Sequence, residues 1–129
     1  MGVGCLTRPP YGEYPEYHTS GDSPAFVEPD AMADTLQTVW EIFGVLERNR
    51  NYVNLNPHGE PQLGNRGLYD TLGGRSDTKQ AQLAMLWVLN LSDGDHNQVQ
   101  IARRAGFPFE VISVAADALH DADLLGLSR

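Results

Sequence analysis

Three short stretches of apolar residues after residue 80 constrain the fold of this chain more than any other feature. In each stretch the apolar side chains recur at helical spacing, which predicts three short helices. Residues 92–95 end the first predicted helix and offer an N-cap for the second helix. Gly106 ends the second helix, and Pro108 lies at the start of the third helix. The sequence then leaves room for at most one short strand. Residues 80–129 are therefore predicted to form a small, mainly helical helix-turn-helix unit of the winged type.

A longer amphipathic helix is predicted at residues 30–49, because Pro29 and Asp30 supply a helix start. Its apolar side chains form one continuous stripe that needs a partner surface. The sequence therefore predicts a protein partner, or a dimer, that covers this helix. The stripe consists of Met32, Leu36, Val39, Trp40, Phe43 and Leu46.

The segments on either side of this helix are predicted to be irregular. Residues 1–30 are rich in proline and glycine, with one short strand expected at residues 3–7. Residues 50–78 carry turn-forming residues throughout, and the polar run at their end is typical of a linker. The chain therefore divides into two predicted domains, residues 1–75 and residues 80–129.

Charge disfavours several classes of partner. The chain has a net charge of −8, and the third predicted helix carries Glu110 and Asp117 but no Lys or Arg. Nucleic acids and anionic membranes are bound mainly through Lys and Arg, so neither is an expected partner and a transcriptional regulator is disfavoured. A single cysteine, Cys5, allows no internal disulfide and no cysteine-based zinc site. With no signal peptide and no membrane-spanning run, the chain is expected to be cytoplasmic.

His18 is the candidate metal ligand. Tyr14, Tyr17 and Thr19 surround it in the sequence and could hold its imidazole in one orientation. A loop histidine bonded to the backbone is the alternative, and the spacing alone favours it. A catalytic zinc site needs three or more protein ligands, whereas His58, His96 and His120 lie in unrelated contexts. His96 is expected to be exposed to solvent.

Two carboxylates lie close to His18 in the sequence, and both are candidates for positioning the ligand. Asp22 and Glu16 could accept a hydrogen bond from the imidazole. For Glu16 an ordinary solvated loop carboxylate is at least as well supported. For Asp22 we favour a structural role, as a cap ahead of the following helix.

Arg66 lies in a loop, residues 54–69, that is dense in glycine and polar groups. One interpretation is a substrate-facing loop in which Arg66 binds a carboxylate or another anion. The other is an ordered connector that packs across a domain boundary. The sequence supports the two equally.

Two long motifs and the tail carry a family resemblance. Residues 8–22 and 54–69 resemble two signatures of the DUF4910 group of aminopeptidase-like proteins, which are related to the M28 zinc peptidases. The tail from Leu86 onward is similar to the C-terminal winged helix-turn-helix of that group, so the resemblance spans essentially the whole chain. The motifs read Arg8-Pro9-Pro10-Tyr11-Gly12-Glu13-Tyr14-Pro15-Glu16-Tyr17-His18-Thr19-Ser20-Gly21-Asp22, Asn54-Leu55-Asn56-Pro57 and Glu60-Pro61-Gln62-Leu63-Gly64-Asn65-Arg66-Gly67-Leu68-Tyr69.

The resemblance implies the α/β fold of an M28-like zinc aminopeptidase, a mixed sheet with helices on both faces that holds two metal ions. Residues 1–75 would be a C-terminal part of this fold, followed by the winged-helix module. Only His18 matches a metal-ligand position, and the other ligands and the general-base glutamate would lie upstream of Met1. The chain would then be a truncated product, a fragment or half of a split protein. It departs from the family at Asn65, which removes a charge from its loop, and at Gly21.

Two functions follow. In the first, the chain is part of a zinc aminopeptidase-like enzyme that cleaves an amide at the N-terminal end of a peptide or an aminoacylated substrate, and it is inactive alone. In the second, it is a non-enzymatic module whose winged helix binds a protein partner.

Overall fold

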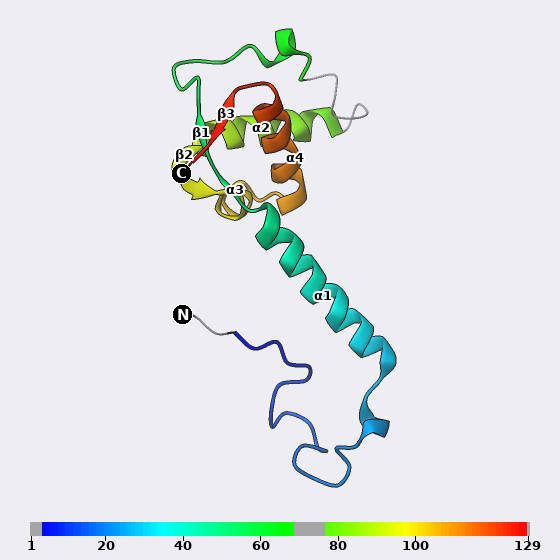
Figure 1. The fold of residues 1–129 in the computed structure, drawn as a ribbon. Helices are drawn as coiled ribbons and strands as arrows, with labels where there is room; N and C mark the ends of the chain where they lie inside the picture. The colour runs from blue at the N-terminus through cyan, green and yellow to red at the C-terminus, as the bar shows by residue number, and fades with distance from the viewer. Residues whose placement is uncertain (1–3, 69–76, 129) are drawn as a thin grey trace. The chain divides into compact units, whose positions relative to one another are not determined.

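A computed structural model of the chain describes residues 4–68 and 77–128 (Figure 1). The chain divides into two compact units, Met1–Gly44 and Val45–Arg129. The long helix α1 (Pro29–Arg48) begins in the first unit and ends in the second. None of the described helices is both long and apolar enough to cross a membrane.

The first unit consists of a turn-rich segment, the single 3-10 turn η1 (Pro24–Phe26) and most of α1. The bounds of α1 confirm the predicted helix at 30–49 to within a residue at each end. The strand predicted at residues 3–7 is wrong for residues 4–7, which are irregular, and Val3 lies outside the described residues. Among residues 4–44, no side chain is buried.

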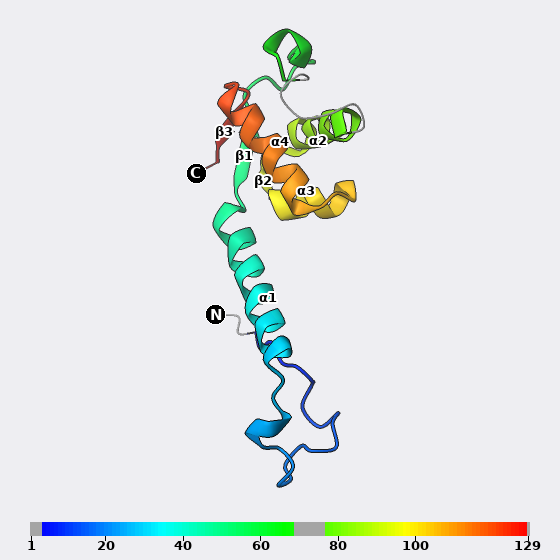
Figure 2. The same ribbon diagram turned by 90° about the vertical axis from the view of Figure 1, so that its right-hand side faces the viewer.

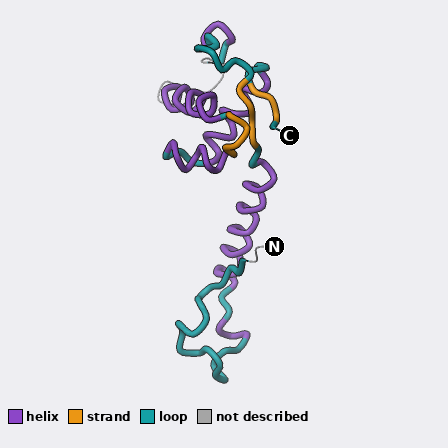
Figure 3. The backbone as a smooth tube through the Cα atoms, turned by 90° about the vertical axis from the view of Figure 1, so that its left-hand side faces the viewer, coloured by secondary structure: helices purple, strands orange, loops and turns teal. Residues whose placement is uncertain are grey.

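The second unit is a winged helix. Its helices α2 (Asp77–Leu91), α3 (Gln98–Ala105) and α4 (Phe109–Asp121) lie on one side of a three-stranded antiparallel sheet (Figures 2 and 3). The sheet order is β2-β1-β3, from β1 (Asn51–Asn54), β2 (Asp93–Asn97) and β3 (Leu125–Leu127). The predicted small helical module with one terminal strand is thus confirmed, whereas the M28-like α/β fragment expected over residues 1–75 stays a prediction.

Two of the three strands were not predicted. β1 lies in the segment 50–78 that was expected to be irregular. The helix ends before residue 92 as expected, but the residues that follow form the strand β2 and not only a turn. β1 takes the centre of the sheet, pairing Tyr52 with Leu127 on one side and Val53 with Asp93 on the other. These partners lie 40 or more residues away, so the pairing is decided by tertiary contacts that local propensity does not encode.

The turns between helices follow local signals. Asn97 caps α3 in a reciprocal capping box, in which the Asn97 side chain accepts from the Gln100 N–H and the Gln100 side chain accepts from the Asn97 N–H. Gly106 ends α3 in the left-handed region at φ 70°, as the sequence predicts. Pro108 then occupies the N-cap of α4. α2 begins at Asp77, inside the expected linker, while residues 75 and 76 lie outside the described residues.

The hydrophobic core of the described residues lies entirely in the second unit. α4 packs against both α2 and α3, and Tyr52 from β1 closes the sheet side. Leu63 and Leu68, from the loop that follows β1, are also buried. This loop is therefore part of the winged-helix core. The remaining core side chains are Ala84, Met85, Val88, Leu89, Leu91, Ile101, Ala102, Ile112, Ala115, Ala116, Leu119, Leu124 and Leu125.

Candidate functional site

The predicted ligand His18 lies on a turn that aromatic rings hold together. His18 has a left-handed backbone, at φ 57°, and its side chain is exposed. The Tyr17 ring meets the imidazole edge-on, with 4.2 Å between centroids. Tyr17 in turn contacts Tyr14 at 5.5 Å, and Tyr14 stacks on Phe26 at 5.5 Å. The expected aromatic support of His18 is thus present in the structure.

Backbone and side-chain hydrogen bonds fix the same turn. The Thr19 hydroxyl donates to the Glu16 carbonyl at 2.8 Å and accepts from the Gly21 N–H at 3.1 Å. The Tyr14 hydroxyl donates to the Asp22 carboxylate at 3.4 Å. Partial desolvation, followed by the charge of Asp22, raises the pKa of Tyr14. Asp22 therefore has a structural contact, but Ser23 and not Asp22 holds the N-cap position of η1.

The turn by itself does not have the donor set of a catalytic metal centre. Within residues 4–68 and 77–128, no three His, Cys, Asp or Glu side chains are grouped so as to hold a metal ion. His18 presents one imidazole, and a zinc centre needs three or more protein ligands. Zinc could therefore bind at His18 only with ligands from outside this turn.

Arg66 has a structural role in the second unit. Its Nε donates to the Pro61 carbonyl and its Nη1 to the Ala122 carbonyl, both at 3.2 Å. Ala122 is the C-cap of α4, where a positive charge also interacts favourably with the helix dipole. These contacts fit an ordered connector, although within the second unit and not across a domain boundary, and an anion-binding role of Arg66 stays a prediction. The second motif of the family resemblance ends at Tyr69, which lies outside the described residues.

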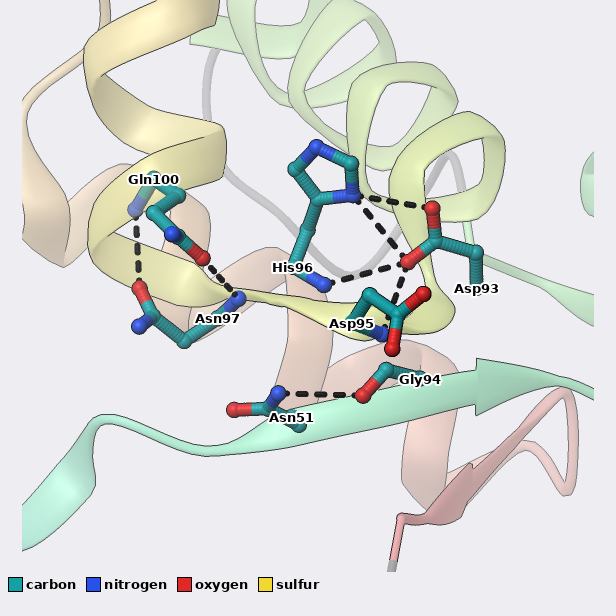
Figure 4. Close-up of polar contacts among 7 residues, drawn as sticks. All are labelled: Asn51, Asp93, Gly94, Asp95, His96, Asn97 and Gln100. Carbon is teal, nitrogen blue, oxygen red and sulfur yellow. Dashed lines mark hydrogen bonds and ion pairs between the residues drawn. The ribbon is translucent and has the colours of Figure 1, made fainter.

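A second polar cluster, which the sequence analysis did not identify, lies at the start of β2 (Figure 4). One carboxylate oxygen of Asp93 accepts from the N–H groups of Asp95 at 2.9 Å and His96 at 3.1 Å. Its other oxygen lies 2.8 Å from Nδ1 of His96. These two backbone donors, and then the imidazole, lower the pKa of Asp93 to about 2.

The same cluster joins β2 to β1. The Asn51 side-chain amide donates to the Gly94 carbonyl at 3.0 Å. His96, which was expected to be exposed, is half-buried, because the contact with Asp93 leaves 32% of its side chain exposed. Its Nε2 points away from Asp93, but the described residues supply no third ligand and hence no metal site. The Asp-Gly-x-His spacing is the local signal that could have predicted this turn.

The outward face of α4 carries acidic side chains. Glu110 and Asp117 are exposed, and the helix contains neither Lys nor Arg. Arg48 reaches Glu110 from the end of α1 at 2.7 Å and lies over the Phe109 ring at 5.4 Å. The Arg48 hydrogen bond lowers the pKa of Glu110. This face resembles neither a phosphate-binding nor a base-reading surface.

Comparison with known proteins divides the chain at almost the same point as its compact units. A winged helix-turn-helix family model matches residues 50–126, and a domain of unknown function (DUF4910) matches residues 1–49. A Clostridium acetobutylicum protein, provisionally named a polysaccharide biosynthesis protein with an aminopeptidase-like domain, is 46% identical over 127 residues. These residues are 98% of this chain and 29% of that protein.

A solved structure gives the same result. The crystal structure of a provisionally named peptidase from Clostridium acetobutylicum is similar to this chain with a TM-score of 0.72 and 42% identity. The match covers 86% of this chain and 23% of that one. The chain therefore spans less than a third of the length of the relatives that it matches.

Proposed function

Because the chain belongs to the winged helix-turn-helix family over residues 50–126 and matches the DUF4910 domain over residues 1–49, we propose that it is a segment of a zinc-dependent aminopeptidase-like hydrolase. The resemblance to the C-terminal part of DUF4910 aminopeptidase-like proteins is confirmed. We propose in addition that the whole protein has an M28-like fold, a zinc site and a substrate with an amide bond.

The observation that supports this function is the turn around His18. Within the segment that matches the DUF4910 domain, it is the place where an exposed imidazole is held by ring contacts and turn hydrogen bonds. In the proposed enzyme, residues 1–49 complete an M28-like α/β domain, and His18 is one of several metal ligands. Zinc bound there would supply an activated water for amide hydrolysis. Tyr17 would orient the imidazole, while Asp22 acts on the turn through Tyr14.

The proposed substrate is the N-terminal end of a peptide or an aminoacylated small molecule. The name of the Clostridium relative points to polysaccharide biosynthesis as the setting of that protein. Because this chain supplies only His18 to the proposed centre, we expect it to be inactive alone, and we expect it in the cytoplasm.

The test uses a chimera in which this chain replaces the matching segment of the Clostridium acetobutylicum relative. We expect the chimera to bind zinc and to hydrolyse aminoacyl-amide substrates in a zinc-dependent way. His18→Ala should weaken zinc binding and lower the rate at least tenfold, because one metal ligand is lost. His58→Ala, another exposed loop histidine, is the matched control and should change neither. Unchanged zinc affinity in His18→Ala, or zinc-dependent hydrolysis by the chain alone, would contradict the proposal.

A second candidate function is a protein-interaction module built on the winged helix. The observation in its favour is the acidic outward face of α4, which suits neither DNA nor an anionic membrane. Zinc titration of the chimera distinguishes the two functions, since only the hydrolase requires a stoichiometric ion. Salt-sensitive binding of duplex DNA to the chain would instead revive a nucleic-acid partner.

A further inference from the structure

One face of α1 carries large apolar side chains that the first unit leaves in solvent. The exposed fractions are 74% for Trp40, 68% for Leu36, 61% for Met32 and 57% for Phe43. The first unit does not compensate with a core, because none of residues 4–44 is buried. Trp40 and Phe43 alone present roughly 250 Å² of side-chain surface, since a whole aromatic side chain has about 200 Å². A patch of several hundred Å² is typical of a binding surface.

A recess at the start of the helix extends this face. It has a volume of about 430 Å³, and most of the residues that line it are apolar. Met32 belongs both to the recess and to the apolar face of α1, so the two are continuous. Arg8 is one of the residues that line the recess, and it forms an ion pair with Asp34. The recess is lined by Arg8, Pro9, Phe26, Val27, Glu28, Ala31, Met32 and Thr35.

The shape of the face identifies the kind of partner. At 100° per residue, Met32, Leu36, Val39, Trp40 and Phe43 cover an arc of about 100°, which is the width of a helix that packs on a globular core. A two-stranded coiled coil uses a narrower seam, and it needs the pattern to continue over about three or four heptads. The stripe extends over about two heptads, up to Leu46. A globular surface therefore fits this face better than a second copy of α1.

We propose that this face, together with the recess, docks residues 4–44 onto the remainder of the aminopeptidase-like domain in a longer protein. We call it the α1 docking surface, made of Met32, Leu36, Val39, Trp40, Phe43 and the recess residues given above. The proposal rests on the proposed function, because the same residues match the DUF4910 domain and the relatives are more than three times as long as this chain. An apolar side chain of that domain fills the recess.

Docking also positions the candidate ligand. Phe26 lines the recess, and it begins a ladder of ring contacts that runs through Tyr14 and Tyr17 to His18. Each step of the ladder is 5.5 Å or shorter between centroids. A partner side chain in the recess restrains Phe26 and, through the ladder, the imidazole. Phe26 is therefore a positioning residue rather than a ligand.

The test compares two neighbouring lysine substitutions in the chimera described above. Leu36→Lys places a charge at the middle of the α1 docking surface, whereas Gln37→Lys places it about 100° away and keeps a partner in Glu41, to which Gln37 donates at 2.7 Å. We expect Leu36→Lys to lower the Tm of the chimera by at least 10 °C and Gln37→Lys to leave it within about 2 °C. If Leu36→Lys does not accumulate, Leu36→Ala is compared with Thr38→Ala on the polar face.

Two further measurements keep the outcomes distinct. In the chain alone, Leu36→Lys should leave the melting of the winged-helix unit unchanged, because Leu36 is not part of its core. Equal Tm values for both lysine variants of the chimera would overturn the proposal. So would a stable dimer of the chain alone that Leu36→Lys converts to monomer, since a second copy would then be the partner. If Leu36→Lys lowers the Tm of the chimera but the chimera neither binds zinc nor hydrolyses substrate, the docking surface is supported and the hydrolase function is refuted.

Discussion

Leu63 provides the sharpest test of how the winged-helix unit is built. It lies in η2 (Leu63–Arg66), 14 residues ahead of α2, yet its side chain is fully buried, at 0% exposure. Truncation to alanine removes apolar contacts and leaves a cavity, which costs about 2–5 kcal/mol for a buried leucine. In a unit of this size each kcal/mol corresponds to about 4–8 °C in Tm, so Leu63→Ala should lower the Tm by about 10 °C or more.

The control is Leu83→Ala, on α2. Leu83 is 51% exposed and alanine is favoured in helices, so this substitution should cost less than about 1 kcal/mol. Both variants are unfolded with urea and followed by the fluorescence of Trp87, which packs against the core, in a Trp40→Phe background. If Leu63→Ala costs no more than Leu83→Ala, the loop after β1 is not part of the winged-helix core, and a domain boundary near residue 75 becomes the better description.

Two further predictions concern polar groups of the same unit. The pKa of Asp93, measured from its carboxyl NMR signal, should be about 2. Because this pKa lies below the ordinary value of 3.8, the ionised Asp93 side chain should stabilise the fold fully above about pH 5, and this stabilisation should be lost as the pH falls toward 2. The stability difference between wild type and Asp93→Asn should shrink over the same range, and a difference that does not depend on pH would refute the carboxylate's role. Gln98 is 1% exposed, and its side-chain amide has no hydrogen-bond partner among the described residues. Gln98→Met should therefore be neutral or stabilise the unit by about 1 kcal/mol in urea unfolding, whereas a clear loss of stability would mean that water satisfies the amide.

The candidate site combines local and non-local features. The ring contacts of Tyr17 and Tyr14 with their neighbours join residues close in sequence, so the turn around His18 could be expected from its composition. Phe26 reaches the same cluster from η1, and that contact was not predicted. Arg66 illustrates the limit of local reasoning. Its partner Ala122 lies 56 residues away, so this contact could not be expected from the loop sequence.

Local signals in the sequence determined the helices of this protein. The stripe of α1, the left-handed Gly106 and the start of α4 each depend on residues within a few positions of one another. Tertiary structure decided the sheet and the extent of the winged-helix unit. β1 is four residues with asparagine at both ends, and β2 reads Asp-Gly-Asp-His-Asn, so neither has the alternating apolar pattern of a strand. Both segments become strands through tertiary contacts. Tyr52 and Leu63 are buried in the core, and residues 51–54 thereby lie between β2 and β3. In this position the backbone N–H and carbonyl groups of residues 51–54 find hydrogen-bond partners on both sides.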